Sequence, residues 1–265
     1  MKTILLPIDP TIANESARTT AALLANRLGG WVDGVPLRPA FTEVMAPDPI
    51  VAVTLPPAGW DENRFDRDAR LVFEENVPKG ADFRWRGGVW ADDGTLGSLG
   101  RIYDLTLMPR PGSGGSRMTA FESALFDSGR PVLMAPKTPP TQIGERIVIH
   151  WNRSSETARA VSLAMPLLRM ATAVLVLHVE GAEVPGPSAR EAAGHLISNG
   201  VPATEKVTAS GARQLGDAIL AEAADFGADL LVKGAYTQSR LRQMIFGGPT
   251  SYILSNADLP VFFAH

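Results

Sequence analysis

The amino-acid sequence repeats its own pattern, and this repeat limits the possible folds more than any other feature. The order of apolar and amphipathic segments in the first half of the chain starts again at Arg146. Residues 104–107 (DLTL) parallel residues 229–232 (DLLV), and residues 131–135 (PVLMA) parallel residues 260–264 (PVFFA). Such self-similarity indicates an internal duplication of one structural unit.

Each unit alternates short apolar runs with amphipathic segments, which is typical of strands that alternate with helices. Strands in this order form a parallel sheet with helices on both faces. The sequence therefore predicts an α/β fold of two tandem doubly wound parallel sheets, Rossmann-like or flavodoxin-like. The expected strands are residues 2–9, 31–37, 81–89, 104–108, 131–135, 146–151, 173–179, 204–209, 229–233 and 260–264. The expected helices are residues 14–28, 61–77, 92–102, 118–127, 155–170, 188–199, 213–226 and 249–256.

The length of 265 residues is comfortable for two domains of about 130 residues each. Residues 137–141 (KTPPT) are rich in proline and form the expected linker. We therefore expect a first domain at residues 1–138 and a second at residues 143–265. Residues 38–59 are also rich in proline, have no counterpart in the second half and are expected to be irregular.

Net charge, cysteine content and the lengths of apolar runs limit the partners and the cellular location that we expect. The net charge of −3 provides no basic field, so neither a nucleic acid nor a membrane surface is an expected partner. The absence of cysteine excludes disulfides and thiolate chemistry and suits a reducing compartment. The apolar run at residues 2–9 is too short for a signal peptide, and no stretch approaches the ~20 apolar residues of a membrane helix. We expect a cytoplasmic protein.

Residues 230–253 combine the features of a strand, a loop and a helix start. An apolar run ends at Gly234, a polar loop with arginines follows, and Gly247, Gly248, Pro249 and Thr250 precede the last expected helix. Glycine lets the backbone approach a ligand, and a helix start offers free N–H groups to an anion. The pattern predicts a phosphate site, but it equally fits a plain strand-to-helix connection that needs glycine for its turns.

In doubly wound sheets the ligand crevice lies beyond the C-terminal ends of the strands, where the winding reverses. In the second half this rule brings Trp151 and Asn152 beside Gly234 and the loop to Gly248. In the first half it brings Asp9 beside residues 110–115. A carboxylate or amide at a strand end could bond a ribose hydroxyl or a base edge.

A resemblance to a known family rests on particular residues. Asp9 and Asn152 end the first strand of each half, Leu177-His178-Val179 closes a second strand, and Gly234-x-x-Thr237 is followed after nine residues by Gly247-Gly248. On these features nearly the whole chain resembles the universal stress protein family in tandem form. The resemblance implies five-stranded parallel sheets in the order 3-2-1-4-5 that pair through their last strands. It also implies an ATP site of the pattern Gly-x-x-Gly-(nine residues)-Gly-Ser/Thr, which some members use and others lack.

The chain departs from this pattern at several positions. Thr237 replaces the second glycine, Gly248 stands where a hydroxyl is expected, and Asn152 replaces the usual strand-end aspartate. The first half keeps Asp9 but has no second glycine pair, and Glu122 near that position would repel phosphate. Each half therefore keeps a different part of the family's site.

The resemblance implies ATP or a related nucleotide as the ligand, with Mg²⁺ if ATP is bound. The implied nucleotide-binding residues are Trp151, Asn152, Val179, Gly234, Thr237, Gly247, Gly248, Pro249 and Thr250, and a vestigial site in the first half would contain Asp9, Arg110 and Gly112. Several of these have an ordinary structural alternative: Asn152 is also a good turn or cap residue, and Trp151 and His178 are typical of strand-end packing.

No catalytic constellation is apparent in the sequence. The four histidines, His150, His178, His195 and His265, lie in no metal-ligand spacing with one another. There is no Gly-x-Ser-x-Gly motif and no phosphate-loop lysine pattern. We expect at most weak ATP hydrolysis, and nothing in the sequence argues for an enzyme.

The favoured interpretation is a stress-response protein with a binding and regulatory role. Its halves are expected to form an intramolecular pseudo-dimer, with residues 131–135 antiparallel to residues 260–264, and further homodimerisation is left open. The alternative is a structural or partner-binding stress protein without nucleotide, which would contact an unknown protein through residues 38–59. A third interpretation is a Rossmann-type enzyme or an electron-transfer flavoprotein subunit.

Overall fold

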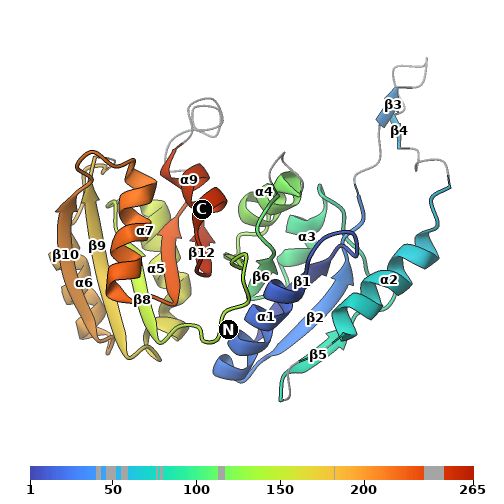
Figure 1. Ribbon diagram of the computed structural model, residues 1–265, viewed down its shortest axis with the longest axis horizontal. Coiled ribbons are helices and arrows are strands. Elements are labelled where there is room, and N and C mark those ends of the chain that lie inside the picture. The colour runs from blue at the N-terminus through green and yellow to red at the C-terminus, as the bar shows by residue number, and fades with distance from the viewer. Residues whose placement is uncertain are drawn as a thin grey trace.

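The computed structural model describes residues 1–39, 43–45, 52–54, 59–75, 77, 80–112, 117–181, 183–235 and 248–265. Their main feature is one ten-stranded sheet with the order β10-β9-β8-β11-β12-β7-β6-β1-β2-β5 (Figure 1). Each half contributes five neighbouring strands, and within each half all strand pairs are parallel. Counted along the chain, the order in both halves is 3-2-1-4-5, as expected.

Strands and helices alternate along both halves, as the periodicity predicts. The first half contains β1 (Thr3–Ile8), α1 (Glu15–Leu28), β2 (Trp31–Pro36), β3 (Glu43–Met45), β4 (Ala52–Thr54), α2 (Glu62–Glu74), β5 (Asp82–Trp85), α3 (Leu96–Gly100), β6 (Leu105–Met108), α4 (Met118–Asp127) and β7 (Val132–Met134). The second half contains β8 (Arg146–His150), α5 (Ser155–Leu168), β9 (Ala173–Glu180), α6 (Ala189–Ser198), β10 (Ala203–Ala209), α7 (Leu215–Phe226), β11 (Leu230–Gly234), α9 (Pro249–Asn256) and β12 (Val261–Ala264).

The two halves meet through their last strands. β7 pairs with β12 in antiparallel register, with Phe262 opposite Leu133. Beside this pair, the rings of Phe121 and Phe263 pack edge to face, with centroids 5.7 Å apart. The predicted antiparallel pairing is therefore confirmed. The expectation of two separate sheets needs correction, because the β7–β12 hydrogen bonds join them into one.

Helices cover both faces of the sheet. Buried residues of α1, α2, α5 and α6 pack on one face, and buried residues of α3, α4, α7 and α9 pack on the other. The inner strands are buried on both sides, which explains why they read as continuous apolar runs, whereas the edge strands β5 and β10 are partly exposed. Among the described residues, no helix is long and apolar enough to cross a membrane.

Local sequence explains most helix boundaries. Gly29 takes a left-handed conformation (φ 59°) and ends α1, and Ser188 and Glu191 form a capping box at the start of α6. Asn14 is the N-cap residue of α1, but its side chain makes no cap bond. Its amide donates to the carbonyls of Asp9 and Ile12 at 2.7 Å each, and its Oδ1 has no hydrogen-bond partner among the described residues.

Residues 38–59 contain regular structure that their composition did not predict. β3 and β4 pair in antiparallel register as a sheet of their own. Figure 1 shows this pair projecting away from the ten-stranded sheet, beyond the start of α2. Proline-rich composition misled the prediction here, because a short pair of strands needs only three residues on each side.

Candidate functional site

The C-terminal edge of the first half is filled by the side chain of Arg117. Its guanidinium donates to Oδ2 of Asp9 from Nε at 2.9 Å and from Nη2 at 2.6 Å, and to Oδ1 of Asp93 from Nη1 at 2.8 Å. It also donates to the carbonyls of Leu37 and Arg38, both at 3.0 Å. The side chains of Arg117 and Asp9 are only 9% and 4% exposed. One cation thus joins the ends of β1 and β2, beside the predicted ligand crevice at the ends of β1 and β6.

Arg117 reaches this place from the first turn of α4. It is the N-cap residue of that helix and adopts a left-handed conformation with φ 62°. The residue in the same position of the second half is Gly248, the N-cap of α9, with ordinary extended backbone (φ −97°, ψ 178°). The duplicated fold therefore carries an arginine at one site and no side chain at the other.

Arg110 and Gly112 do not join Asp9 in a vestigial site. The Arg110 guanidinium donates to the carbonyl of Ser255 at 3.1 Å and lies 3.7 Å from the carboxylate of Asp258. Both acceptors belong to the second half, and Gly112 lines the same junction between the halves. Among the described residues, Nε and Nη2 of Arg110 are buried without a hydrogen-bond partner, so Arg110 as an anion ligand stays a prediction.

In the second half a cavity of about 380 Å³ opens where α7 and α9 begin. Gly216 allows the two helices to approach, because a Cβ added to it would lie 2.7 Å from the Cβ of Tyr252. Free N–H groups and the positive ends of two helix dipoles therefore converge on this cavity. Its lining residues are Gly181, Gln214, Leu215, Gly216, Gly248, Pro249 and Tyr252.

A buried lysine lies beneath the start of α9. The amine of Lys233 donates to the hydroxyl of Thr250 at 2.9 Å and to the carbonyl of Gly234 at 2.6 Å. No carboxylate pairs with it among the described residues, and burial lowers its pKa to about 7. On the neighbouring strand, burial and then the charge of Lys233 lower the pKa of His150 to about 3, so that ring stays neutral.

Asn152 and Gly234 have clear structural roles. Oδ1 of Asn152 accepts from the hydroxyl of Thr157 at 2.6 Å and from the N–H of Ser154 at 3.3 Å, which fixes the turn into α5. Gly234 packs against that same turn, because a Cβ on it would lie 2.4 Å from the nitrogen of Thr157. The turn alternative for Asn152 therefore has direct support, and Gly234 is needed for packing whether or not a ligand binds.

The remaining predicted residues are scattered. Trp151 faces α6, where its indole N–H donates to the carbonyl of Pro187 at 2.8 Å, and Val179 is buried in the core under α7. The ring of His178 bonds the carbonyl of Trp151, as its strand-end packing alternative requires. Thr237 and Gly247 lie outside the described residues. Of the nine predicted nucleotide-binding residues, Gly248 and Pro249 line the α7/α9 cavity, and Thr250 lies just below it.

Comparison with known protein families gives a match for the second half of the chain. Residues 145–265 match the model of the universal stress protein family. The second half belongs to the universal stress protein family. No match was found among curated protein sequences.

Solved structures extend the likeness to the whole chain. A universal stress protein from Archaeoglobus fulgidus DSM 4304 matches 99% of this chain and 95% of its own length, with a TM-score of 0.71 and 17% identity. A functionally unknown protein from Pseudomonas aeruginosa PAO1 matches 100% of this chain and 92% of its own length, with a TM-score of 0.58 and 16% identity. At these identities the likeness concerns the fold, and it shows that both halves share the tandem universal stress protein architecture.

Sequence reasoning missed Arg117, Lys233 and Gly216. Arg117 immediately precedes an expected helix, in register with Gly248, so an alignment of the two α4/α9 starts could have singled it out. Lys233 was visible as a charge at the end of an apolar run. Gly216 carried no signal, because only the packing of α7 on α9 gives it a role.

Proposed function

We propose that the second half binds ATP or a related nucleotide at the cavity between the starts of α7 and α9, and that the chain is a stress-response protein with a binding and regulatory role. The observation that carries this proposal is the pair of helix N-termini that meet at Gly216 and Gly248. Phosphate oxygens are favoured at such a place, because helix N–H groups lack partners and the dipole ends are positive. Membership of the universal stress protein family supports the same ligand class.

Lys233 can supply a positive charge near the proposed phosphate position. Its amine lies one hydrogen bond from Thr250 in the first turn of α9, and it has no carboxylate partner among the described residues. An anion bound above Thr250 would favour the protonated amine by Coulomb attraction through a poorly screened interior. Nucleotide binding is therefore expected to be accompanied by proton uptake near pH 7.

The equivalent position in the first half is occupied by Arg117, which supports placing the nucleotide site in the second half. The five hydrogen bonds of Arg117 occupy the carboxylate and carbonyl acceptors at the ends of β1 and β2. A nucleotide there would have to displace a buried ion pair and leave Asp9 unpaired, which costs about 3–5 kcal/mol. We therefore propose that the first half does not bind nucleotide.

Any Mg²⁺ would arrive with the triphosphate. Among the described residues there is no group of three histidine or carboxylate side chains that could hold a metal ion. Mg²⁺ is commonly bound through phosphate oxygens and water with few protein ligands. We propose no catalytic role, since the described part of the crevice contains no pair of acid and base side chains.

The first test is to denature freshly purified protein and analyse released nucleotides by mass spectrometry. ATP is then titrated into the stripped protein while the melting temperature is followed. Binding raises the melting temperature, because a ligand that binds only the folded state stabilises it. No released nucleotide and no shift at millimolar ATP would refute the proposal.

Variants at Gly248 locate the site. Gly248→Arg introduces the first half's arginine, and combining it with Asn152→Asp adds a carboxylate like that of Asp9. We expect the double variant to lose ATP binding while its melting temperature without ATP is retained. The control is Gly194→Arg on α6, which makes the same change in charge as Gly248→Arg alone, at a place where nothing lies within 4 Å of the new Cβ. Equal ATP affinity in the double variant and the control would place binding elsewhere.

A second candidate function is partner binding without nucleotide. The pair β3–β4 favours it, because this pair projects from the body of the protein and has no equivalent among the described residues of the second half (Figure 1). Replacing residues 40–58 by a short glycine-serine linker should abolish capture of a protein partner and leave ATP-induced stabilisation unchanged. Unchanged capture would exclude this segment as the interaction surface.

We further propose that residues 1–138 and 143–265 are the two domains. Limited proteolysis should cut first within residues 137–141, because that segment is an extended connection between two packed units. Cleavage within β6, β7 or β8 instead would contradict this boundary.

A further inference from the structure

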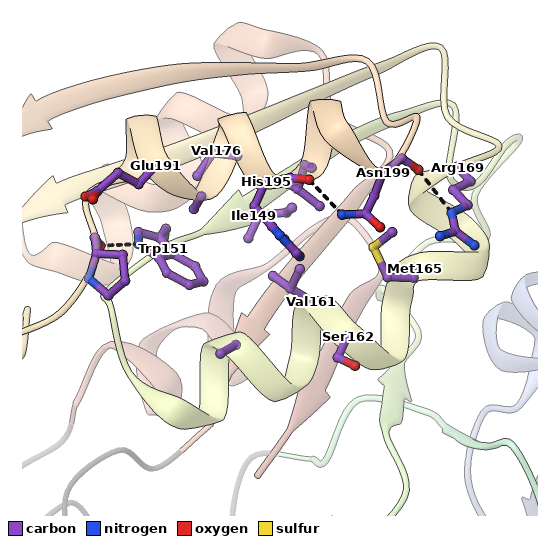
Figure 2. Close-up of a pocket in the computed structure, with 14 residues that line it drawn as sticks. Ile149, Trp151, Val161, Ser162, Met165, Arg169, Val176, Glu191, His195 and Asn199 are labelled. Carbon is purple, nitrogen blue, oxygen red and sulfur yellow. Dashed lines mark hydrogen bonds between the residues drawn. The ribbon is translucent and has the colours of Figure 1, made fainter.

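A second cavity of the universal stress protein half lies on the opposite face of the sheet from the α7/α9 cavity. It is a slot of about 650 Å³ between α5 and α6 (Figure 2). Its floor is formed by Ile149, Trp151 and Val176, all at most 8% exposed. The volume is within the roughly 300–1,000 Å³ of small-molecule sites. None of the residues that line it lines the α7/α9 cavity.

The two halves differ in the floor of this cavity, although a smaller cavity of about 460 Å³ also lies between α1 and α2. Strand register pairs Ile149 with Val176 on the floor, and the corresponding pair in the first half is Leu6 with Gly34. There the ring of Phe73 covers the sheet so closely that a Cβ on Gly34 would lie 2.5 Å from it. Phe73 is itself packed on Phe83 and Trp85. An aromatic side chain thus covers in the first half the strand positions that form the open floor in the second.

The two ends of the slot differ in charge. Figure 2 shows Glu191 and Trp151 at one end and Arg169 and Asn199 at the other. The Glu191 carboxylate is already held by the N–H and hydroxyl of Ser188, at 2.8 and 2.7 Å. At the other end, Nε of Arg169 donates to the carbonyl of Asn199 at 3.2 Å, and no carboxylate pairs with this guanidinium among the described residues. Of the two charged ends, only the Arg169 end attracts an anion.

The middle of the slot is long and mostly apolar, with Ser162 and His195 as its polar side chains. Val161 and Met165 of α5 face Ala192 and Leu196 of α6 across it. Ala158 and Arg169 mark its ends on α5, and eleven helical steps correspond to about 16 Å. A chain-like apolar ligand matches this shape better than a compact ring.

We propose that this slot binds an elongated amphipathic anion, specifically a medium-chain alkyl carboxylate. The carboxylate lies at Arg169, and the alkyl chain runs between α5 and α6 toward Trp151. This site is independent of the proposed nucleotide crevice, and its test does not require nucleotide binding.

The probe is decanoate, titrated into the full chain by isothermal calorimetry below its micelle concentration. We expect one saturable site per chain, with affinity that rises about fourfold for each methylene from octanoate to decanoate. Decanol, which has the chain without the charge, should bind more weakly. Absence of saturable binding would overturn the proposal.

Two variants and one control locate the ligand. Arg169→Gln should weaken decanoate about three- to tenfold and leave decanol unchanged, because only the charged head contacts the guanidinium. Ala192→Trp fills the half-buried middle of the slot and should abolish binding of both probes. Arg190→Gln removes an exposed arginine of the same α6 that does not line the slot, and should have no effect. Equal decanoate affinity in all three variants would show that the ligand binds elsewhere and would overturn the proposal.

Discussion

Nε and Nη2 of Arg117 both donate to Oδ2 of Asp9, at 2.9 and 2.6 Å. This pair closes the first half at the position where a tandem universal stress protein fold could hold a ligand. In the second half Gly248 and Asn152 occupy the corresponding positions, and neither brings a charge. The two halves thus differ at equivalent positions: protein side chains fill the first, and the second has no such charged pair.

The Asp9–Arg117 pair is predicted to be important for stability. Arg117→Met should lower the free energy of unfolding by about 3–5 kcal/mol, because it leaves a buried carboxylate without its cation. Asp9→Asn combined with Arg117→Met should recover part of this loss, since the uncompensated charge is gone. Urea denaturation measures both. The control Arg64→Met, at an arginine whose side chain is 75% exposed, should change stability by less than about 0.5 kcal/mol. A loss below about 1 kcal/mol in Arg117→Met would contradict the prediction.

Lys233 is predicted to make stability depend on pH. Its pKa falls from 10.5 to about 7 on folding, because the charged amine is buried. Between these values the unfolded chain holds a proton that the folded chain lacks, so stability rises with pH across this window. Below pH 7 both states hold the proton, and the folded state bears the whole cost of the buried charge.

Lys233→Met removes this cost and should stabilise the protein more at pH 6.5 than at pH 9.5. The gain in the free energy of unfolding should be about 2–3 kcal/mol larger at pH 6.5 than at pH 9.5. Urea midpoints at both pH values measure it. Lys206→Met, at a partly exposed lysine paired with Glu222, is the matched control and should show no comparable difference. Equal increments for Lys233→Met at the two pH values would mean that Lys233 titrates normally.

Gly234 is predicted to be needed for folding stability, independently of any ligand. Gly234→Ala should lower the free energy of unfolding by about 1–3 kcal/mol with or without ATP, because the new Cβ would lie 2.4 Å from the nitrogen of Thr157. Gly194→Ala, in the open interior of α6, should instead stabilise by about 0.5–1 kcal/mol. Thermal melts with and without ATP distinguish the cases. Loss of ATP binding at unchanged stability would assign Gly234 to the ligand site.

The contact between Phe121 and Phe263 is predicted to couple the unfolding of the two halves. Phe263→Ala should cost about 3–5 kcal/mol and separate one cooperative transition into two, because it empties the junction beside β7 and β12. Phe73→Ala removes an equally buried ring far from the junction and should destabilise without separating the transitions. Calorimetry reports the number of transitions. A single transition in Phe263→Ala would show that the strand pairing alone couples the halves.

Much of the architecture followed from local patterns. Apolar periodicity located the strands of the main sheet, and the repeat of DLTL as DLLV and of PVLMA as PVFFA predicted the duplication and the β7–β12 junction. These properties are written in neighbouring residues, since period and turn chemistry act over a few positions. The pair β3–β4 escaped because its strands are short and its surroundings rich in proline.

The sequence by itself therefore determined the α/β class, the tandem repeat and the family resemblance of the second half, while tertiary structure decided what occupies each site. Arg117 and Asp9 lie 108 positions apart, and no spacing rule connects them. Their contact depends on the left-handed backbone at Arg117 and on the strand order that brings β1 beside β6. In the same way, only packing showed that Gly234 supports α5 and that the slot beside Trp151 is open. Side-chain contacts between distant segments are set by the geometry of the folded chain, which local residue patterns do not encode.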